Sequence, residues 1–392
     1  MKILFLSTRI PYPLTAGFRI RIYNEAKYLK KAGHQISLMY IGNLEDYQRY
    51  KQELKIVFDK IYLIQLNKIE AIFNLCKTVF NPVKPFQVAL YESSRFYKHL
   101  KELAGEYDVI IGNTIRTAEY LRRIGADKAI LDLHDAISYN YKNAIKNMKG
   151  LQKLIYKIEY YRVLHYEKDS IRTFRKVVII SEDDKNYFWK NGVDVRHVSV
   201  IPVAVRDDIT AQKTNYKQIS RDICFLGKMS YQPNEDAAIW FAQSVLPILR
   251  KDCPDIQFSI MGIEPSPKVK SLESWGNIKV TGFLDDPYAY ISTCLAMVVP
   301  IRNGAGMQNK VLESMYVGTP TVISPIAAEG IAGQNGVHYL QANTPEEYAH
   351  SILQLLKSPQ LCQLIGEKAR KLVNDKYTWG VLSAQWEKLI ST

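Results

Sequence analysis

The 392-residue sequence has few cysteines and none in a clustered pattern. Its five cysteines are scattered, and no two of them form a Cys-x-x-Cys pair. The odd number and the scatter argue against a disulfide framework and against a zinc cluster, and they favour a reducing compartment. No repeat with a period of about 20–50 residues and no low-complexity segment is visible, which excludes solenoids and repeat arrays.

Long apolar runs are also absent. No run approaches the roughly 20 apolar residues that a membrane-spanning helix needs. The apolar start, Ile3–Leu6, is too short for a signal peptide, and Arg9 and two prolines follow it at once. We therefore predict that it is a buried strand, and that the protein is cytoplasmic or lies at the cytosolic face of the cell membrane.

Metal and nucleic-acid motifs are missing as well. The sequence has no strict Asp-x-Asp motif and no His/Cys group at ligand spacing, so we expect no metal. The net charge of +13 is spread along the chain, with no basic stripe interleaved with aromatic residues, so we expect no nucleic-acid partner. The charge fits either a solvated surface or attraction to phosphates or anionic lipid, and alone does not decide between them.

What the sequence does contain is an α/β pattern. The apolar Ile3–Leu6 leads into a proline-containing loop that runs to Gly17. Apolar residues then recur at helical spacing up to Gly33, a plausible C-cap, and Ile36–Ile41 has the composition of a second strand. This βαβ unit places a loop at the carboxyl end of its first strand, where open α/β sheets bind ligands.

Strand and helix patterns alternate through the rest of the chain, which predicts parallel sheets covered on both faces. The length and the 47% apolar content favour two such domains, with a cleft between them as the default ligand site. The polar segment Arg206–Arg221 is the expected linker, and the strongest helices after it are Asp236–Leu249 and Met307–Val317. Further strands are expected at Ile61–Ile64, Val109–Ile111, Ala129–Leu131, Val177–Ile180, Ile223–Leu226, Ile256–Met261, Ile278–Val280, Ala296–Val299 and Thr321–Ile323.

Two helical patterns in the first half allow two interpretations. Ile69–Phe80 is apolar and carries Lys68 and Lys77 beside it, and Lys149–Lys176 is rich in tyrosine, lysine and arginine. Core packing is one interpretation. Peripheral contact with an anionic membrane is the other.

The segment with the most specific chemistry is a glycine-rich loop before a helix. A strand ends at Pro300, and Gly304 and Gly306 permit a tight turn and a close approach to a ligand. A helix is expected to start near Met307, so that its free N–H groups and positive dipole end face the loop. This arrangement predicts a phosphate-binding cradle.

Two charged residues strengthen this prediction. Lys310 lies one turn into the helix, and Glu313 follows three residues later on the same face. A lysine there can neutralise a diphosphate, and a carboxylate can accept two hydrogen bonds from a ribose diol. The alternative is an ordinary capped helix with a solvated Lys–Glu pair.

The segment Val299–Pro320 resembles the donor-binding motif of the retaining GT-B glycosyltransferases of the large family 4. It is particularly similar to bacterial exopolysaccharide and capsule transferases with a Gly-x-Gly-x-x-x-Lys-x-x-Glu pattern. The resemblance covers most of the chain. Its other matching segments are Phe225–Asn234, Val280–Asp286, Ile179–Asp184, Val200–Pro202 and Trp379–Ile390.

This resemblance implies two Rossmann-like parallel-sheet domains that face each other across a cleft. Residues 1–205 would form the acceptor-side domain, 206–375 the nucleotide-sugar-binding domain, and 376–392 a helix that crosses back to the first domain. The nucleotide-sugar would be a substrate, and no cofactor is implied.

The resemblance also implies roles for individual residues. Phe283 and Leu284, after Gly282, would border the base, and Glu313 would hold the ribose. Lys228 and Lys310 would hold the diphosphate, together with the backbone of Gly227, Gly304, Ala305, Gly306, Met307 and Gln308. On the acceptor side, His134 would contact the donor sugar, with Gly17 and Arg19 in the phosphate loop.

The sequence departs from the family pattern at several of these positions. The family has two glutamates eight positions apart, and Ala305 stands at the first of them. Lys228 stands where the family has arginine, and Pro233 stands where it has lysine, a charge that Lys310 can supply. Only Gly17 remains of the usual glycine pair in the first loop.

Some residues keep a structural interpretation beside the functional one. His134 directly follows a strand and is either a structural residue or a cleft residue, and Asp135 is a possible cap for the next helix. Arg19 and Arg21 are surface charges or ligands of an acceptor phosphate, and we favour the second role for Arg19. Ser181 is expected to begin a helix.

Together these features predict metal-independent transfer of a sugar, with retention, from a nucleotide-sugar to a glycan or lipid-linked acceptor of surface-polysaccharide type. One alternative is a sugar-nucleotide epimerase of similar fold. The other is a catalytically silent partner in a polysaccharide assembly complex, an idea that the missing first glutamate keeps open.

Overall fold

The computed structural model describes the whole chain except residues 126–127, 147, 210–214, 217–219, 304–306 and 392. Contacts between residues divide it into two compact units. Unit 1 comprises Met1–Pro202 and Trp379–Thr392, and unit 2 comprises Val203–Thr378. The segment expected as a linker therefore begins inside unit 2.

Unit 1 is built on a parallel sheet with the strand order β3-β2-β1-β4-β5-β6-β7. The central strands are buried along almost their whole length, as expected for near-continuous apolar runs covered on both faces. The strands are β1 (Lys2–Ser7), β2 (Gln35–Ile41), β3 (Lys60–Ile64), β4 (Val109–Asn113), β5 (Ala129–His134), β6 (Lys176–Ile179) and β7 (Val198–Val200).

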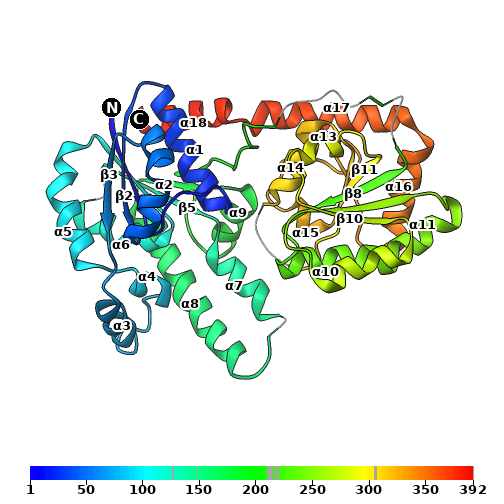
Figure 1. Cartoon of the computed structure of the whole chain (residues 1–392). Coiled ribbons are helices and arrows are strands. Elements are labelled where there is room, and N and C mark those ends of the chain that lie inside the picture. The colour runs from blue at the N-terminus through cyan, green and yellow to red at the C-terminus, as the bar shows by residue number, and fades with distance from the viewer. Residues whose placement is uncertain (126–127, 147, 210–214, 217–219, 304–306, 392) are drawn as a thin grey trace. The chain divides into compact units, whose positions relative to one another are not determined.

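Helices cover this sheet (Figure 1), and the last helix of the chain packs against the first. Trp386 in the middle of α18 donates from its indole Nε1 to Glu25 of α1 at 3.1 Å. The helices are α1 (Gly17–Lys31), α2 (Leu44–Val57), α3 (Lys68–Lys77), α4 (Phe86–Leu90), α5 (Ser94–Leu103), α6 (Ile115–Ile124), α7 (Ile137–Ile145), α8 (Gly150–Thr173), α9 (Glu182–Lys190) and α18 (Trp379–Ser391). A 3-10 turn, Ala104–Glu106, follows α5.

Unit 2 has a second parallel sheet, with the order β10-β9-β8-β11-β12-β13. In Figure 1 its central strands lie between α10 on one side and α13 and α14 on the other. The strands are β8 (Asp222–Leu226), β9 (Gln257–Met261), β10 (Ile278–Gly282), β11 (Ala296–Val299), β12 (Thr321–Ile323) and β13 (Leu340–Gln341). The helices are α10 (Gln232–Trp240), α11 (Leu246–Asp252), α12 (Pro267–Lys270), α13 (Pro287–Ile291), α14 (Asn309–Val317), α15 (Pro325–Ala328), α16 (Pro345–Lys357) and α17 (Pro359–Lys376).

Both sheets reverse their strand order at one point. In unit 1 the chain leaves β3 and returns beside β1 as β4, and in unit 2 it leaves β10 and returns beside β8 as β11. Loops on the two sides of such a point diverge and leave a crevice at the carboxyl ends of the strands. The two Gly-containing loops singled out in the sequence follow β1 and β11, so each lies at one of these points.

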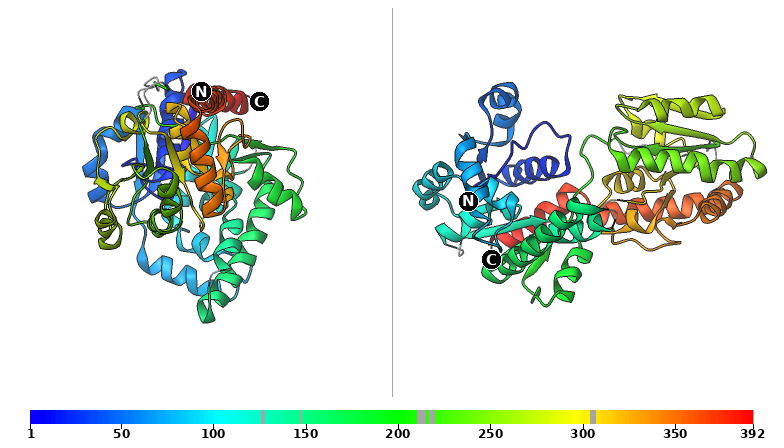
Figure 2. Two further views of the ribbon diagram at one scale, coloured as in Figure 1. Left: turned by 90° about the vertical axis from the view of Figure 1, so that its right-hand side faces the viewer. Right: turned by 90° about the horizontal axis from the view of Figure 1, so that it is seen from below.

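The expected elements are present, with differences at their ends. The helix predicted at Asp236–Leu249 runs through α10, a π-helical turn at Phe241–Val245, and α11. These elements are yellow-green in Figure 2. The helix predicted to start near Met307 starts at Asn309, because Gln308 has an extended backbone and stands at the N-cap. The short strands β7 and β13 and the 3-10 turn Ser271–Trp275 were not predicted.

Candidate functional site

The site begins with three loops of unit 2 that are bonded to one another at the carboxyl edge of its sheet. Gly227 after β8 donates its N–H to Met261 O at 3.0 Å, and Met229 donates to Ile263 O at 3.0 Å. Gly262 after β9 donates to Gly282 O of β10 at 2.9 Å. The loop of Gly227 is therefore fixed between strands β8 and β9.

Two of these glycines are required by close packing. A Cβ on Gly262, whose φ is +135°, would lie 1.8 Å from Gly227 O. A Cβ on Gly227 would lie 2.7 Å from Asn234 Nδ2 and 3.0 Å from Lys310 Nζ. Gly227 was predicted from the sequence, whereas Gly262 was not. The packing shows that the first turn after β8 touches the Lys310 ammonium group.

Lys310 of α14 reaches across to this turn. Its Nζ donates to Asn234 Oδ1 at 2.6 Å, and Asn234 Nδ2 in turn donates to Lys228 O at 3.0 Å. The ammonium also lies 4.6 Å from the centre of the Phe225 ring. Burial lowers the pKa of Lys310 to about 7, and the charge of Glu313 opposes this shift only in part. At neutral pH the lysine is therefore only partly protonated, and a bound anion would favour its charged form.

Glu313 is buried one turn further along α14. Burial raises the pKa of its carboxyl group, and a hydrogen bond with Tyr288 and the charges of Arg206 and Lys310 act in the opposite direction. Arg206 is itself held by Asp208 through hydrogen bonds of 2.9 and 2.6 Å. The neighbours Tyr288 and Arg206 come from elements distant in sequence and were not predicted.

Lys228, predicted to hold the diphosphate, forms an ion pair in the structure. Its Nζ lies 2.9 Å from Glu264 Oε2, and Ser230 Oγ donates to the same oxygen at 2.6 Å. Both partners of the ion pair are about half exposed, so the pair can open at little cost. The Lys228 ammonium lies at the loop of Gly227, where it is paired with Glu264.

The remaining residues predicted for the donor lie around the same edge. Gly282 ends β10 with a φ of +66°, Phe283 after it is exposed, and Leu284 packs partly against the core of unit 2. Met307 and Gln308 are half-buried and precede α14. Gly304, Ala305 and Gly306 lie outside the described residues.

In unit 1, His134 ends strand β5 with a φ of +66°, a region that few non-glycine residues adopt. Its backbone N–H donates to Asp132 Oδ1 at 3.2 Å, and its ring Nε2 lies 3.4 Å from Asp132 Oδ2. Burial lowers the pKa of His134, against the opposing charge of Asp132, so the ring is neutral near pH 7. Nε2 itself has no hydrogen-bond partner among the described residues, although the buried Asp132 carboxylate lies beside it.

That carboxylate is paired with Arg21. The guanidinium donates to both oxygens of Asp132, at 2.8 and 3.2 Å, and to the carbonyl oxygens of Ile201 and Pro202. Arg21 is 1% exposed, so the interpretation of it as a surface charge was wrong. A fully buried arginine needs such a partner because an unpaired buried charge is costly.

The first loop of unit 1 contains the other predicted acceptor residues. Gly17 is the first residue of α1, and Arg19 lies in its first turn. Arg19 Nη1 donates to Pro13 O at 3.3 Å, and its buried Nε has no acceptor among the described residues. Asp135 does not cap α7. Its Oδ2 accepts from Asn140 at 2.6 Å, while Glu167 of α8 accepts from the N–H groups of Ile137 and Ser138. Ser181 does cap α9, as predicted.

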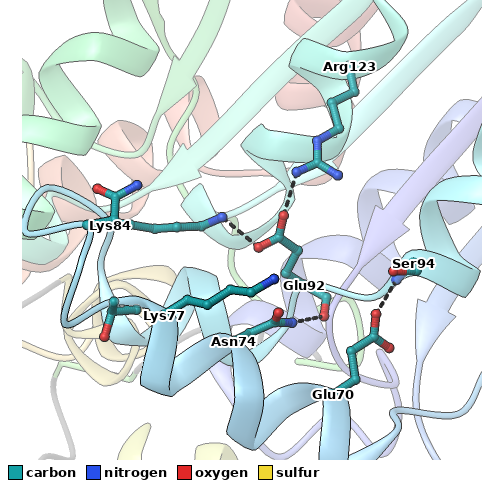
Figure 3. Close-up of a pocket in the computed structure, with 9 residues that line it drawn as sticks. Glu70, Asn74, Lys77, Lys84, Glu92, Ser94 and Arg123 are labelled. Carbon is teal, nitrogen blue, oxygen red and sulfur yellow. Dashed lines mark hydrogen bonds and ion pairs between the residues drawn. The ribbon is translucent and has the colours of Figure 1, made fainter.

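A cavity of about 470 Å³ lies elsewhere in unit 1, beside α3. Figure 3 shows Glu92 between Lys84 and Arg123, at 2.6 and 2.5 Å, and Glu70 accepting from the Ser94 N–H at 2.8 Å. Because these charges already neutralise one another, the cavity is a weaker candidate for a phosphate ligand than the edge of unit 2.

Two kinds of feature are absent from the described part of the chain. None of its helices is long and apolar enough to cross a membrane. Within the same residues, no three His, Cys, Asp or Glu side chains are grouped so that they could hold a metal ion.

Part of the chain matches a known family. Residues 220–358 match the family model described as Glycosyl transferases group 1. An uncharacterized 44.6 kDa protein in the cps region of Klebsiella pneumoniae is 24% identical over 390 residues, which cover 96% of each chain. Residues 220–358, which match the family model, contain most of unit 2, including the loops after β8, β9, β10 and β11.

Solved structures resemble the whole chain. TarM has a TM-score of 0.70 at 12% identity, with 100% of this chain and 99% of that chain covered. Anabaena Alr3699/HepE, solved in complex with UDP, has a TM-score of 0.68 at 14% identity and 100% of both chains covered. The fold is therefore GT-B, and together with the family match it supports a glycosyltransferase in general terms.

Proposed function

We propose that the protein is a retaining family 4 glycosyltransferase that moves a sugar from a nucleotide-sugar to a glycan or lipid-linked acceptor without a metal ion. The observation that carries the proposal is the position of Lys310. Its ammonium lies at the reversal point of the unit 2 sheet, against the turn after β8, and its backbone lies in the first turn of α14. This is where a phosphate group gains both the lysine charge and the free N–H groups of a helix.

The proposed chemistry concerns the diphosphate, which is the leaving group of the transfer. When the bond from the sugar to the diphosphate breaks, negative charge develops on the diphosphate, and a preorganised ammonium stabilises it. Lys310 supplies this charge, and Lys228 can join it when its exposed pair with Glu264 opens. No cofactor takes part in this scheme, and the nucleotide-sugar is a substrate.

The rest of the proposal assigns the other donor contacts. Glu313, buried and close to Lys310, accepts hydrogen bonds from the ribose, and the exposed ring of Phe283 borders the base. A neutral His134 donates to or accepts from a sugar hydroxyl. HepE was solved with UDP, which makes UDP the first nucleotide to test.

The test is a thermal-shift screen of the full chain against UDP, GDP, ADP, CMP and their common sugar conjugates, repeated with Lys310→Ala. We expect one nucleotide family to stabilise the protein, because a ligand that binds only the folded state raises its melting temperature. The shift should disappear in the variant. If no nucleotide at millimolar concentration gave a shift, a silent assembly partner would replace the enzyme as the better explanation.

We also propose that unit 1 contacts an anionic membrane at the cytosolic face, through residues 68–83, which comprise α3 and the segment after it, and through the first half of α8. Of the twenty large apolar side chains exposed in the described residues, eleven lie in these two segments. They are Ile69, Ile72, Phe73, Val79, Phe80 and Val83 in the first, and Leu151, Leu154, Ile155, Ile158 and Tyr161 in the second. The three on α3 and the five on α8 follow helical spacing, so an apolar stripe of each helix faces solvent.

The charge beside these stripes fits an anionic surface. Residues 149–158 contain three lysines and no acidic residue, and 68–84 contain three lysines and one glutamate. Arg162 of α8 donates to Thr78 O at 3.2 Å and so joins the two segments. Apolar side chains with flanking lysines are the composition of interfacial helices.

This part is tested by sedimentation with vesicles of phosphatidylcholine alone and of an equal mixture with phosphatidylglycerol. We expect binding to the mixture that falls at high salt and is lost in Phe73→Glu/Ile155→Glu. Ile56→Glu, an equally exposed position on α2, is the matched control and should bind as the native chain does. Equal loss in the control, or no binding by the native chain, would contradict the proposal.

A further inference from the structure

Three arginines gather at the carboxyl edge of the unit 1 sheet. Arg9 follows β1, Arg19 lies in the first turn of α1, and Arg116 lies in the first turn of α6, directly after β4. Strands β1 and β4 are neighbours in the sheet and flank the point where its strand order reverses. The arginines therefore come from the two loops that border the expected crevice of this unit.

Two aromatic rings link the three side chains. The guanidinium groups of Arg9 and Arg19 each lie 5.7 Å from the centre of the Phe18 ring. Arg9 Nε also donates to Tyr91 Oη at 3.4 Å, and the Arg116 guanidinium lies 5.3 Å from the centre of the Tyr91 ring. Stacking on rings orients a guanidinium without neutralising it, because a ring carries no net charge.

None of the three has a carboxylate within ion-pair distance in the described part of the chain. Their hydrogen-bond acceptors are neutral: Tyr91 Oη for Arg9, Pro13 O for Arg19 and Gln87 Oε1 for Arg116. The buried Nε of Arg19 has no acceptor among the described residues. By contrast, the neighbouring Arg21 forms a bidentate pair with Asp132.

The electrostatics of the cluster are unfavourable without an anion. Burial lowers the pKa of Arg116, the positive charge of Arg9 lowers it further, and the charge of Asp135 compensates only in part. Helices α1 and α6 both start without a side-chain cap and without an acidic residue in the first turn. Each instead carries an arginine there, where the positive end of the helix dipole favours negative charge.

We propose that Arg9, Arg19 and Arg116 form an anion site that takes a phosphate or diphosphate group. As a role in the reaction, this rests on the proposed function: the group belongs to the acceptor, which would then be a phosphorylated or lipid-diphosphate-linked glycan. Planar guanidinium groups match the oxygens of a phosphate, and the two helix N-termini add N–H donors. The site extends the predicted Arg19 contact by two residues that the sequence did not single out.

The experiment is calorimetric titration of the full-length chain with inorganic pyrophosphate, performed in the Lys310→Ala background so that the donor edge of unit 2 contributes little. Arg9→Gln and Arg116→Gln are each expected to weaken binding about tenfold or more, since each removes charge-assisted hydrogen bonds. Arg116→Lys should restore part of the affinity, because it keeps the charge and loses only the planar fork. Arg49→Gln, an exposed arginine on α2, is the matched control and should change nothing.

The outcomes separate this site from the donor site. Pyrophosphate binding that is lost in the double variant Arg9→Gln/Arg116→Gln, while nucleotide still stabilises the same double variant carrying Lys310, supports the inference. Pyrophosphate binding that survives in the double variant, or that falls equally in Arg49→Gln, overturns it. If no nucleotide shifts the melting temperature of the native chain, the proposed function fails, and the arginine site is still judged by its own titration.

Discussion

At the scale of single residues, Lys310 is the group on which the donor assignment depends. Replacing Lys310 by alanine removes the ammonium that faces the developing charge. We expect kcat/KM to fall by about two to three orders of magnitude, or about 2.7–4 kcal/mol, as when one preorganised donor is removed from a charge-stabilising site. Steady-state kinetics with the nucleotide-sugar found in the thermal-shift screen measures this effect.

The matched control is Lys251→Ala, which removes an exposed lysine from α11 of the same unit. It should leave kcat/KM unchanged. Transfer at near-native rates by the Lys310 variant would remove the charge-stabilising role from this residue.

The contact between Lys310 and Asn234 predicts a pH dependence. Only the ammonium form binds a diphosphate, and the pKa of Lys310 in the folded protein is about 7, below the ordinary 10.5. The lysine therefore loses its proton as pH rises through about 7, and kcat/KM, which reports the free enzyme, should fall over the same range. Asn234→Asp places a carboxylate next to Nζ, raises the pKa of the lysine, and should move this fall to higher pH.

The comparison of the two pH–rate profiles is the measurement. A role of Asn234 in packing alone would lower the rate at every pH and leave the midpoint in place. An unmoved midpoint in Asn234→Asp would therefore contradict the assigned contact.

The site residues that local spacing alone predicted lie in one continuous segment, whereas the others were predicted from the family resemblance. Lys310 and Glu313 are three positions apart on one helix, so their spacing already predicted a common face. Asn234, Tyr288 and Arg206 reach the same two side chains from other elements, and only the folded sheet brings them there. No local pattern marks such residues.

At the scale of elements, the last helix is part of the core of unit 1. Trp386 of α18 is 1% exposed, and its indole is bonded to Glu25, whose pKa burial raises to about 8. Trp386→Ala should lower the free energy of unfolding by about 3–5 kcal/mol, because it opens a large cavity and removes the indole donor of Glu25, which keeps its ion pair with Arg21. Urea unfolding measures the loss.

A second tryptophan serves as the control for this prediction. Trp189 on α9 is 65% exposed, and Trp189→Ala should change the free energy of unfolding by no more than about 0.5 kcal/mol. Equal losses for the two variants would mean that α18 does not stabilise the unit through Trp386.

The sequence predicted elements best where their pattern is long. Strand β1 was recognisable from its apolar run, and helix α1 from apolar residues that recur at helical spacing over several turns. Strands β7 and β13 have three and two residues, too few for any periodicity. Arg21 has the spacing of a surface residue, and only its distant partner Asp132 makes it a buried one.

At the scale of the whole molecule, one unit is formed by a continuous stretch of chain and the other is not. Unit 2 is one continuous stretch, Val203–Thr378, with its own apolar core. Its two ends are joined, because Val205 N donates to Tyr377 O at 2.8 Å. Unit 1 is discontinuous and needs the returning α18. We therefore expect Val203–Thr378 to fold when it is produced alone.

This isolated unit provides the last test of the donor assignment. It contains Lys310, Glu313 and Lys228 but lacks His134. The nucleoside diphosphate that stabilises the whole chain should therefore stabilise it too, by about 2.7 kcal/mol at a hundred times the Kd. The nucleotide-sugar should bind no better than the diphosphate, since the proposed sugar contact is absent. Thermal shifts of the isolated unit measure both. A folded unit 2 that did not bind the nucleotide would show that the donor contacts lie elsewhere, and one that preferred the nucleotide-sugar would remove His134 from the proposed site.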